Sequence, residues 1–176
     1  MTFRNLLTLA LVASVSLWAS AQPAPPRLTA GEQLQLLKTN RELLEDLLDR
    51  GARISDAHTP LDRAAECQIS ADRLARELRT AVDRSDADRA GEIGGFVETI
   101  VADGFVPNLE IARRTANPGS PDYERVKAMH REATRSLDDL TATLPTAGPL
   151  AKSKRIQQAR EKLAEASAKL GKPQSE

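Results

Sequence analysis

Apolar side chains recur at steps of three and four residues along most of this chain, a spacing that predicts helices rather than strands. The first helix is expected over residues 30–50, because Thr29 and Glu32 stand at capping-box spacing and Gly51 follows the last apolar position. We expect this helix to bury its apolar face against neighbouring helices. That face carries Leu34, Leu37, Leu44 and Leu48, and is widened by Leu36, Leu43 and Leu47.

Two later segments repeat the pattern and have clear starts. Thr59 precedes Pro60, an N-cap followed by proline at the first helical position, so a second helix is expected to run to about residue 84. Ser120 and Pro121 repeat this arrangement and predict a helix over residues 121–144. The apolar row of the earlier helix is Leu61, Ala64, Cys67, Ala71, Leu74, Leu78 and Ala81, and that of the later one is Val126, His130, Ala133, Leu137, Leu140 and Leu144.

The segment between these two helices, residues 86–116, is the least regular. Its glycines each lower helix propensity by about 1 kcal/mol relative to alanine. Pro107 would clash with the carbonyl group one turn earlier, so the helix is predicted to be kinked or broken between Gly104 and Pro107. The glycines of this segment are Gly91, Gly94, Gly95 and Gly104.

A last helix is expected over residues 150–170, ending at Gly171, with apolar positions at coiled-coil spacing. Long amphipathic helices joined by short turns predict an all-α fold, an antiparallel bundle of four to five helices. Alanines and glycines on the apolar rows favour close packing without a roomy interior. The seam of the last helix is Ile156, Ala159, Leu163, Ala166 and Leu170.

The N-terminus has the pattern of a secretory signal peptide. Arg4 precedes an uncharged apolar run, residues 6–18, that is shorter than the ~20 residues of a membrane-spanning helix. Ala19 and Ala21 stand where a signal peptidase reads small residues, which predicts cleavage before Gln22. The expected organisation is a signal peptide (1–21), an extended proline-rich lead-in (22–28), a helical bundle domain (29–171) and a disordered tail (172–176). The mature protein is expected to be periplasmic or secreted, with no transmembrane span.

Composition argues against several functional classes. The 25 basic and 25 acidic residues balance, so the chain has no overall field to attract nucleic acid. After residue 21 the aromatic residues are Phe96, Phe105 and Tyr123, which is little material for a stacking site. The sequence contains no haem-attachment, phosphate-loop or zinc-protease motif, so no cofactor and no catalytic residue is predicted.

Two side chains are weak candidates for metal binding. Cys67 lies on an apolar row, which favours a buried thiol over an intermolecular disulfide or a metal ligand. His130 also lies on an apolar row, but Lys127 occupies the position where a bundle metal site would carry glutamate, which favours a satisfied or edge-exposed imidazole. The carboxylates, which cluster near residues 42–49 and 83–88, are interpreted as solvated and weakly ion-paired.

The last helix has a regional excess of positive charge, whereas the first helix is acidic. These two helices either pack as neighbours or simply solubilise the bundle. Alternatively, the basic helix docks on an anionic envelope surface or partner. The residues of this possible interaction surface are Lys152, Lys154, Arg155, Arg160, Lys162 and Lys169.

The leading hypothesis is an exported, non-enzymatic helical protein that acts as an interaction or structural module of the cell envelope. Its partner is expected to be another envelope protein or a second copy of itself. One alternative is a metal- or stress-responsive periplasmic binding protein that uses His130, Cys67 or the acidic clusters. Another is a small enzyme whose site carries no recognised motif.

Overall fold

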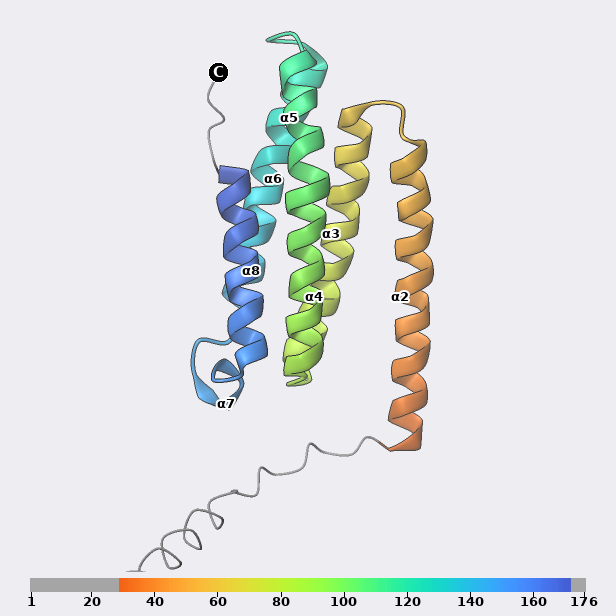
Figure 1. Ribbon diagram of the computed structural model, residues 1–176, viewed down its shortest axis with the longest axis vertical. Coiled ribbons are helices and arrows are strands. Elements are labelled where there is room, and N and C mark those ends of the chain that lie inside the picture. Colours follow the sequence, from red (N-terminus) through yellow and green to blue (C-terminus); the bar gives the residue numbers. More distant parts are fainter. Residues whose placement is uncertain (1–28, 172–176) are drawn as a thin grey trace, which may run out of the picture. The chain divides into compact units, whose positions relative to one another are not determined.

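The computed structural model describes residues 29–171, which are helical and contain no strand (Figure 1). The expected signal peptide, its cleavage site at Ala19, Ala21 and Gln22, the lead-in and the C-terminal tail lie outside the described residues. The chain divides into two units, Met1–Leu43 and Leu44–Glu176. Helix α2, Ala30–Asp56, runs across this division. The helical bundle described below belongs to the second unit.

The predicted capping box opens α2. The Thr29 hydroxyl accepts the backbone N–H of Glu32 at 3.3 Å, and the Glu32 carboxylate accepts the backbone N–H of Thr29 at 2.7 Å. The predicted end at Gly51 is wrong, because α2 continues to Asp56. A glycine ends a helix by adopting a left-handed conformation. Among the residues described, Gly51 is not one of the glycines with positive φ, and it stays in the helix.

Helix α3, Pro60–Asp83, and helix α4, Ala87–Thr99, begin at side-chain caps. The Thr59 hydroxyl accepts the N–H of Asp62 at 3.1 Å, as the sequence predicts, and Asp86 accepts the N–H of Arg89 at 3.0 Å. Between these helices the backbone of Ser85 turns with φ 58°. Most of the predicted apolar row of α3 is buried, namely Leu61, Ala64, Cys67, Leu74, Leu78 and Ala81.

The irregular segment stays helical through its proline. A π-helix, η2 (Ile100–Phe105), follows α4 and leads directly into α5, Val106–Thr115. The N–H of Val106 bonds to the carbonyl of Val101, five residues earlier, and Pro107 then takes an early position in α5. Wider hydrogen bonding of this kind absorbs an interruption of the helical ladder. The backbone is therefore continuous here, and a bend of the helix axis stays a prediction.

Helix α6, Pro121–Thr143, begins where predicted, with the Ser120 hydroxyl accepting the N–H of Tyr123 at 3.2 Å. One position of its predicted row is wrong, because Met129 is buried and His130 is exposed. The predicted row repeats every seven residues, whereas an α-helix has 3.6 residues per turn, so the row gradually rotates around the helix. Either of two neighbouring residues can then face the core at a given level.

The last predicted helix is divided into α7, Gly148–Ala151, and α8, Lys154–Gly171. The N–H of Lys152 turns back to the Pro149 carbonyl at 3.2 Å, and the Ser153 hydroxyl accepts the N–H of Arg155 at 3.2 Å. A serine that offers its hydroxyl to the backbone competes with helix continuation and favours a new start. The predicted seam of α8 is completely buried.

Helices α4 and α8 pack closely against each other, and α3 contacts α4, η2, α5 and α6. Gly91 and Gly94 make the α4–α8 approach possible. A Cβ atom added to Gly91 would lie 2.9 Å from the Cβ of Arg155, and one on Gly94 would lie 2.9 Å from the Cβ of Ala159. The predicted role of these two glycines in close packing is confirmed. Gly95 faces open space instead.

Candidate functional site

Cys67 is a free, buried thiol in the middle of the bundle. Burial raises the pKa of this thiol, and the negative charge of neighbouring Glu66 raises it further. A Cβ atom added to Gly104 would lie 2.9 Å from the sulfur, so the π-helix presses closely on it. A thiolate is needed for nucleophilic attack or metal ligation. These surroundings favour the neutral thiol, which acts here as a small apolar side chain.

His130, the other weak candidate for metal binding, has a structural partner. Its Nε2 atom lies 3.0 Å from the carbonyl oxygen of Leu170, and in the tautomer that carries the proton there, the ring donates to this carbonyl. Leu170 stands at the end of α8, where helix carbonyls lack backbone donors. The contact therefore ties α6 to the end of α8. Within residues 29–171, no group of three or more His, Cys, Asp or Glu side chains is placed to hold a metal ion.

A groove of about 550 Å³ opens beside this contact. Figure 1 shows α5 and α6 continuing beyond the end of α8, and the groove lies where these three helices meet. We call it the α5–α6–α8 groove. The interior expected from sequence was close-packed, and this open groove was not predicted. It is lined by Val106, Leu109, Glu110, Arg113, Tyr123, Val126, Lys127, His130, Arg131, Leu170 and Gly171.

A second cavity lies inside the bundle and is far smaller, about 20 Å³, with Asp72 and Ser136 among the residues that line it. The Ser136 hydroxyl donates to the Asp72 carboxylate at 3.1 Å. Burial raises the pKa of Asp72, while the Ser136 hydrogen bond opposes that shift. This space has the size of one water molecule. It is too small to admit an organic substrate, so the raised pKa of Asp72 does not by itself mark an enzyme site.

The basic side chains of α8 are exposed for the most part, and three of them form ion pairs with α4. Arg155 lies 3.3 Å from Asp88, and Lys169 lies 3.3 Å from Glu98. Lys162 is shared between Glu98 at 3.9 Å and Glu165 at 3.1 Å. The acidic neighbour that pairs with these side chains is thus α4, whereas the sequence suggested the first helix. Lys152, Lys154 and Arg160 complete the predicted interaction surface, and no ion pair joins them to another described residue.

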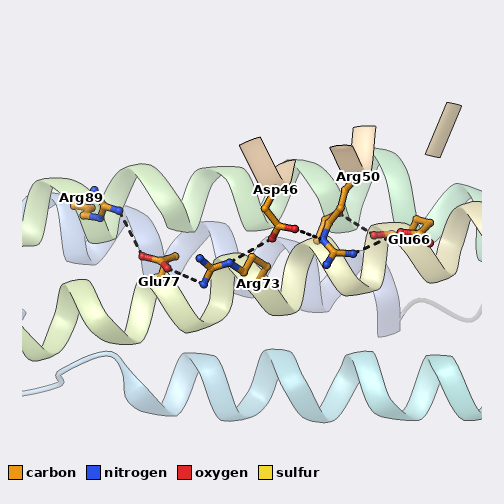
Figure 2. Close-up of polar contacts among 7 residues, drawn as sticks. Asp46, Arg50, Glu66, Arg73, Glu77 and Arg89 are labelled. Carbon is orange, nitrogen blue, oxygen red and sulfur yellow. Dashed lines mark hydrogen bonds and ion pairs between the residues drawn. The ribbon is translucent and has the colours of Figure 1, made fainter. Parts of the chain in front are cut away.

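The part of α2 that belongs to the second unit is joined to α3 by a chain of ion pairs. Figure 2 shows these charges alternating in sign from α2 through α3 to α4. Asp46 lies 3.3 Å from Arg50 and 3.4 Å from Arg73, and Arg50 also lies 3.7 Å from Glu66. The acidic cluster of the first helix is therefore partly used for packing, which its spacing in sequence did not reveal.

Glu77 continues this chain from α3 to α4. Its carboxylate is nearly buried and lies 2.8 Å from Arg73 and 3.5 Å from Arg89 (Figure 2). Two guanidinium groups compensate the cost of burying this charge. The network is a structural element rather than a reactive one, because each charge in it has an opposite neighbour.

The face of α2 that carries Leu34, Leu37, Leu44 and Leu48 is exposed, which contradicts the expectation that this row is buried. Leu44 is 60% exposed and Leu48 is 72% exposed. The spacing of the four residues places them on one side of the helix. We call them the leucine row. The sequence grouped these four residues with Leu36, Leu43 and Leu47 on one apolar face. In the structure Leu43 is buried and Leu36 and Leu47 are half-buried, so the leucine row differs in exposure from the rest of the predicted face.

None of the helices in residues 29–171 is long and apolar enough to cross a membrane. Comparison of the chain with protein-family models, with curated proteins and with solved structures finds no match.

Proposed function

We propose that the protein is an exported, non-enzymatic helical module that works in the periplasm or outside the cell by binding another protein chain through α2. The observation that carries this proposal is the exposed leucine row. Single exposed leucines are common on protein surfaces and need no explanation. On this helix face Leu34 and Leu37 form one apolar pair and Leu44 and Leu48 form another, with Arg41 between them, and exposed apolar groups of this kind mark interaction surfaces. The signal-peptide pattern of residues 1–21 supports export.

The architecture proposed for this module is an antiparallel bundle of four to five long helices, with a bend in the third predicted helix between Gly104 and Pro107. Short connections between consecutive helices support the antiparallel arrangement. The π-helix that ends just before Pro107 supports the bend, because kinks concentrate at such hydrogen-bond irregularities.

The occupant that best fits the leucine row is a second copy of the chain. Leu34, Arg41 and Leu48 are one heptad apart, and Leu37 and Leu44 form the companion positions of a coiled-coil seam. A parallel pair in register would place the two Arg41 side chains against each other in the same layer. An antiparallel pair avoids this clash and places Leu37 of one copy beside Leu48 of the other.

The charges beside the seam favour the same antiparallel arrangement. Lys38 and Glu45 both flank the leucine row on one side, one heptad apart. In an antiparallel pair this flank of one helix meets the same flank of the other, so Lys38 of each copy approaches Glu45 of its partner copy. Flanking charges of opposite sign set orientation and partner choice in helical pairs.

The test compares two double variants by sedimentation equilibrium across micromolar concentrations. The full chain is expressed, and the form that the cell exports is purified. We expect the wild type to dimerise and L44E/L48E to weaken dimerisation at least tenfold, because each glutamate would be desolvated in the seam. The matched control is F96E/I111E, which changes two other exposed apolar residues and should alter dimerisation less than twofold.

A wild type that stays monomeric at every concentration, or two double variants with equal effects, would contradict pairing through α2. Capture of a different envelope protein that is lost in L44E/L48E would replace the second copy as the occupant. Export is tested separately by N-terminal sequencing of the periplasmic and culture fractions. We expect Gln22 as the first residue, and an intact Met1 in the cytoplasm would contradict export.

A further inference from the structure

We propose that the α5–α6–α8 groove binds a small amphiphile with one apolar chain and an anionic head group. Its volume of about 550 Å³ falls in the range of small-molecule sites, and such sites are mostly apolar with a few polar groups that orient the ligand. This function is distinct from chain pairing through α2. It involves different helices and a different class of partner.

The floor of the groove is built from core side chains. Val106, Leu109, Val126 and Leu170 all line it, and each is nearly buried within the bundle. These residues come from three different helices, so the apolar surface is part of the packed core. An alkyl chain lying on them would be removed from water at about 25 cal/mol per Å² of apolar area.

The rim of the groove is mainly positive. Arg113 and Arg131 line it, both are exposed, and no ion pair joins either of them to another residue in 29–171. Lys127 adds a positive charge that it shares with Glu124 at 3.1 Å. Glu110 is the acidic side chain among the lining residues. Guanidinium groups bind carboxylates and phosphates through paired hydrogen bonds, so the rim selects an anionic head.

His130 stabilises the wall of the groove at the end of α8. Its contact with the Leu170 carbonyl occupies an acceptor that would otherwise repel an anion. The groove therefore offers positive side chains at its rim, and one of the helix-end carbonyls beside it is already engaged. This arrangement distinguishes the groove from a simple gap between helix ends.

The chain's own C-terminal segment is a poorer occupant. Residues 172–176 read Lys-Pro-Gln-Ser-Glu and carry a single apolar side chain, whereas the groove has an apolar floor. A protein partner also fits less well, because stable protein interfaces bury about 800 Å² on each side and involve 20–30 residues. The size of the groove, its apolar floor and its positively charged rim favour a small amphiphile.

The experiment titrates the full chain with dodecanoate below its micelle-forming concentration and measures binding by calorimetry. Dodecanol and dodecyltrimethylammonium serve as neutral and cationic probes of the same chain length. We expect dodecanoate to bind at least tenfold more tightly than either. The variant R113E/R131E should weaken dodecanoate binding at least tenfold and leave dodecanol binding within twofold. The matched control R135E/K154E changes net charge equally at exposed residues outside the groove and should bind as the wild type does.

Three results would overturn the proposal. The first is equal binding of the three probes, which would indicate nonspecific apolar association. The second is an equal loss of dodecanoate binding in both double variants, which would indicate a general charge effect. The third is binding that appears only after deletion of residues 172–176, which would make the C-terminal segment the occupant in the full chain. Because all substituted residues are exposed, circular dichroism should show the same folded state in every variant.

Discussion

Helices α2 and α8 carry similar rows of apolar residues and use them in opposite ways. The seam of α8 is fully enclosed, with Leu163 at 0% exposure, whereas Leu48 on the leucine row of α2 is 72% exposed. The difference lies in the surface that faces each apolar row. Gly91 and Gly94 on α4 give α8 a surface that it can approach closely. A periodic apolar row thus identifies a face that needs a cover, but the neighbouring helix decides whether the chain supplies that cover.

The largest expected effect comes from truncating one leucine in each row. Leu163→Ala should lower the free energy of unfolding by about 3 to 5 kcal/mol, because it opens a cavity in a closely packed seam. Leu48→Ala should change it by less than about 0.5 kcal/mol, because an exposed side chain leaves no cavity. Urea titration of both variants at low protein concentration measures the difference. Equal losses would show that α2 is covered in the monomer and would remove the contrast between the two helices.

A smaller effect is expected from adding one methyl group to the α4–α8 contact. Gly94→Ala should cost about 1 to 3 kcal/mol, since its Cβ atom would lie 2.9 Å from the Cβ and 3.1 Å from the Cα of Ala159. Gly95→Ala, which faces open space, should instead stabilise by up to about 1 kcal/mol through helix propensity. Thermal unfolding measures whether each variant is less or more stable than the wild type.

The double variant G94A/A159G provides the control for this contact. The single variant A159G should itself cost about 1 kcal/mol of helix propensity. In the A159G background Gly94→Ala should cost less than it does in the wild type, because the two positions share one space. An equal cost in both backgrounds would show that the cost of Gly94→Ala does not come from its contact with Ala159.

Local signals in the sequence predict the fold well. Thr59 and Ser120 cap the helices that they were expected to cap, and the seam of α8 is buried as its spacing indicates. These features depend on residues a few positions apart. The two boundary errors, at Gly51 and at the start of α8, arise where the local signal permits two conformations. Gly51 accepts a helical backbone, and Ser153 can continue a helix or begin one.

The candidate sites were not predictable in the same way. The exposure of Leu44 depends on which helix faces α2, and the α5–α6–α8 groove depends on where α8 ends relative to α5 and α6. Arg113 and Arg131 are distant from Leu170 in the sequence, and no sequence motif indicates that the three residues lie together. Cys67 and His130 attracted attention as reactive residue types. Cys67 is buried in the core, and His130 contacts a backbone carbonyl at the end of α8, so both side chains have structural roles.

The smallest effect tests what holds the second part of α2 against α3. Asp46→Ala removes ion pairs to Arg50 and Arg73, and should cost about 0.5 to 1 kcal/mol at low ionic strength, because partly exposed pairs contribute little. Salt should reduce this cost. The exposed Asp49→Ala is the matched control and should change stability less. Hydrogen exchange should accelerate at residues 44–56 in Asp46→Ala while the seam of α8 stays protected. If salt leaves the cost unchanged, or if α8 loses protection to the same degree, then charge does not anchor this part of α2, and the two apolar rows belong to one cooperative core.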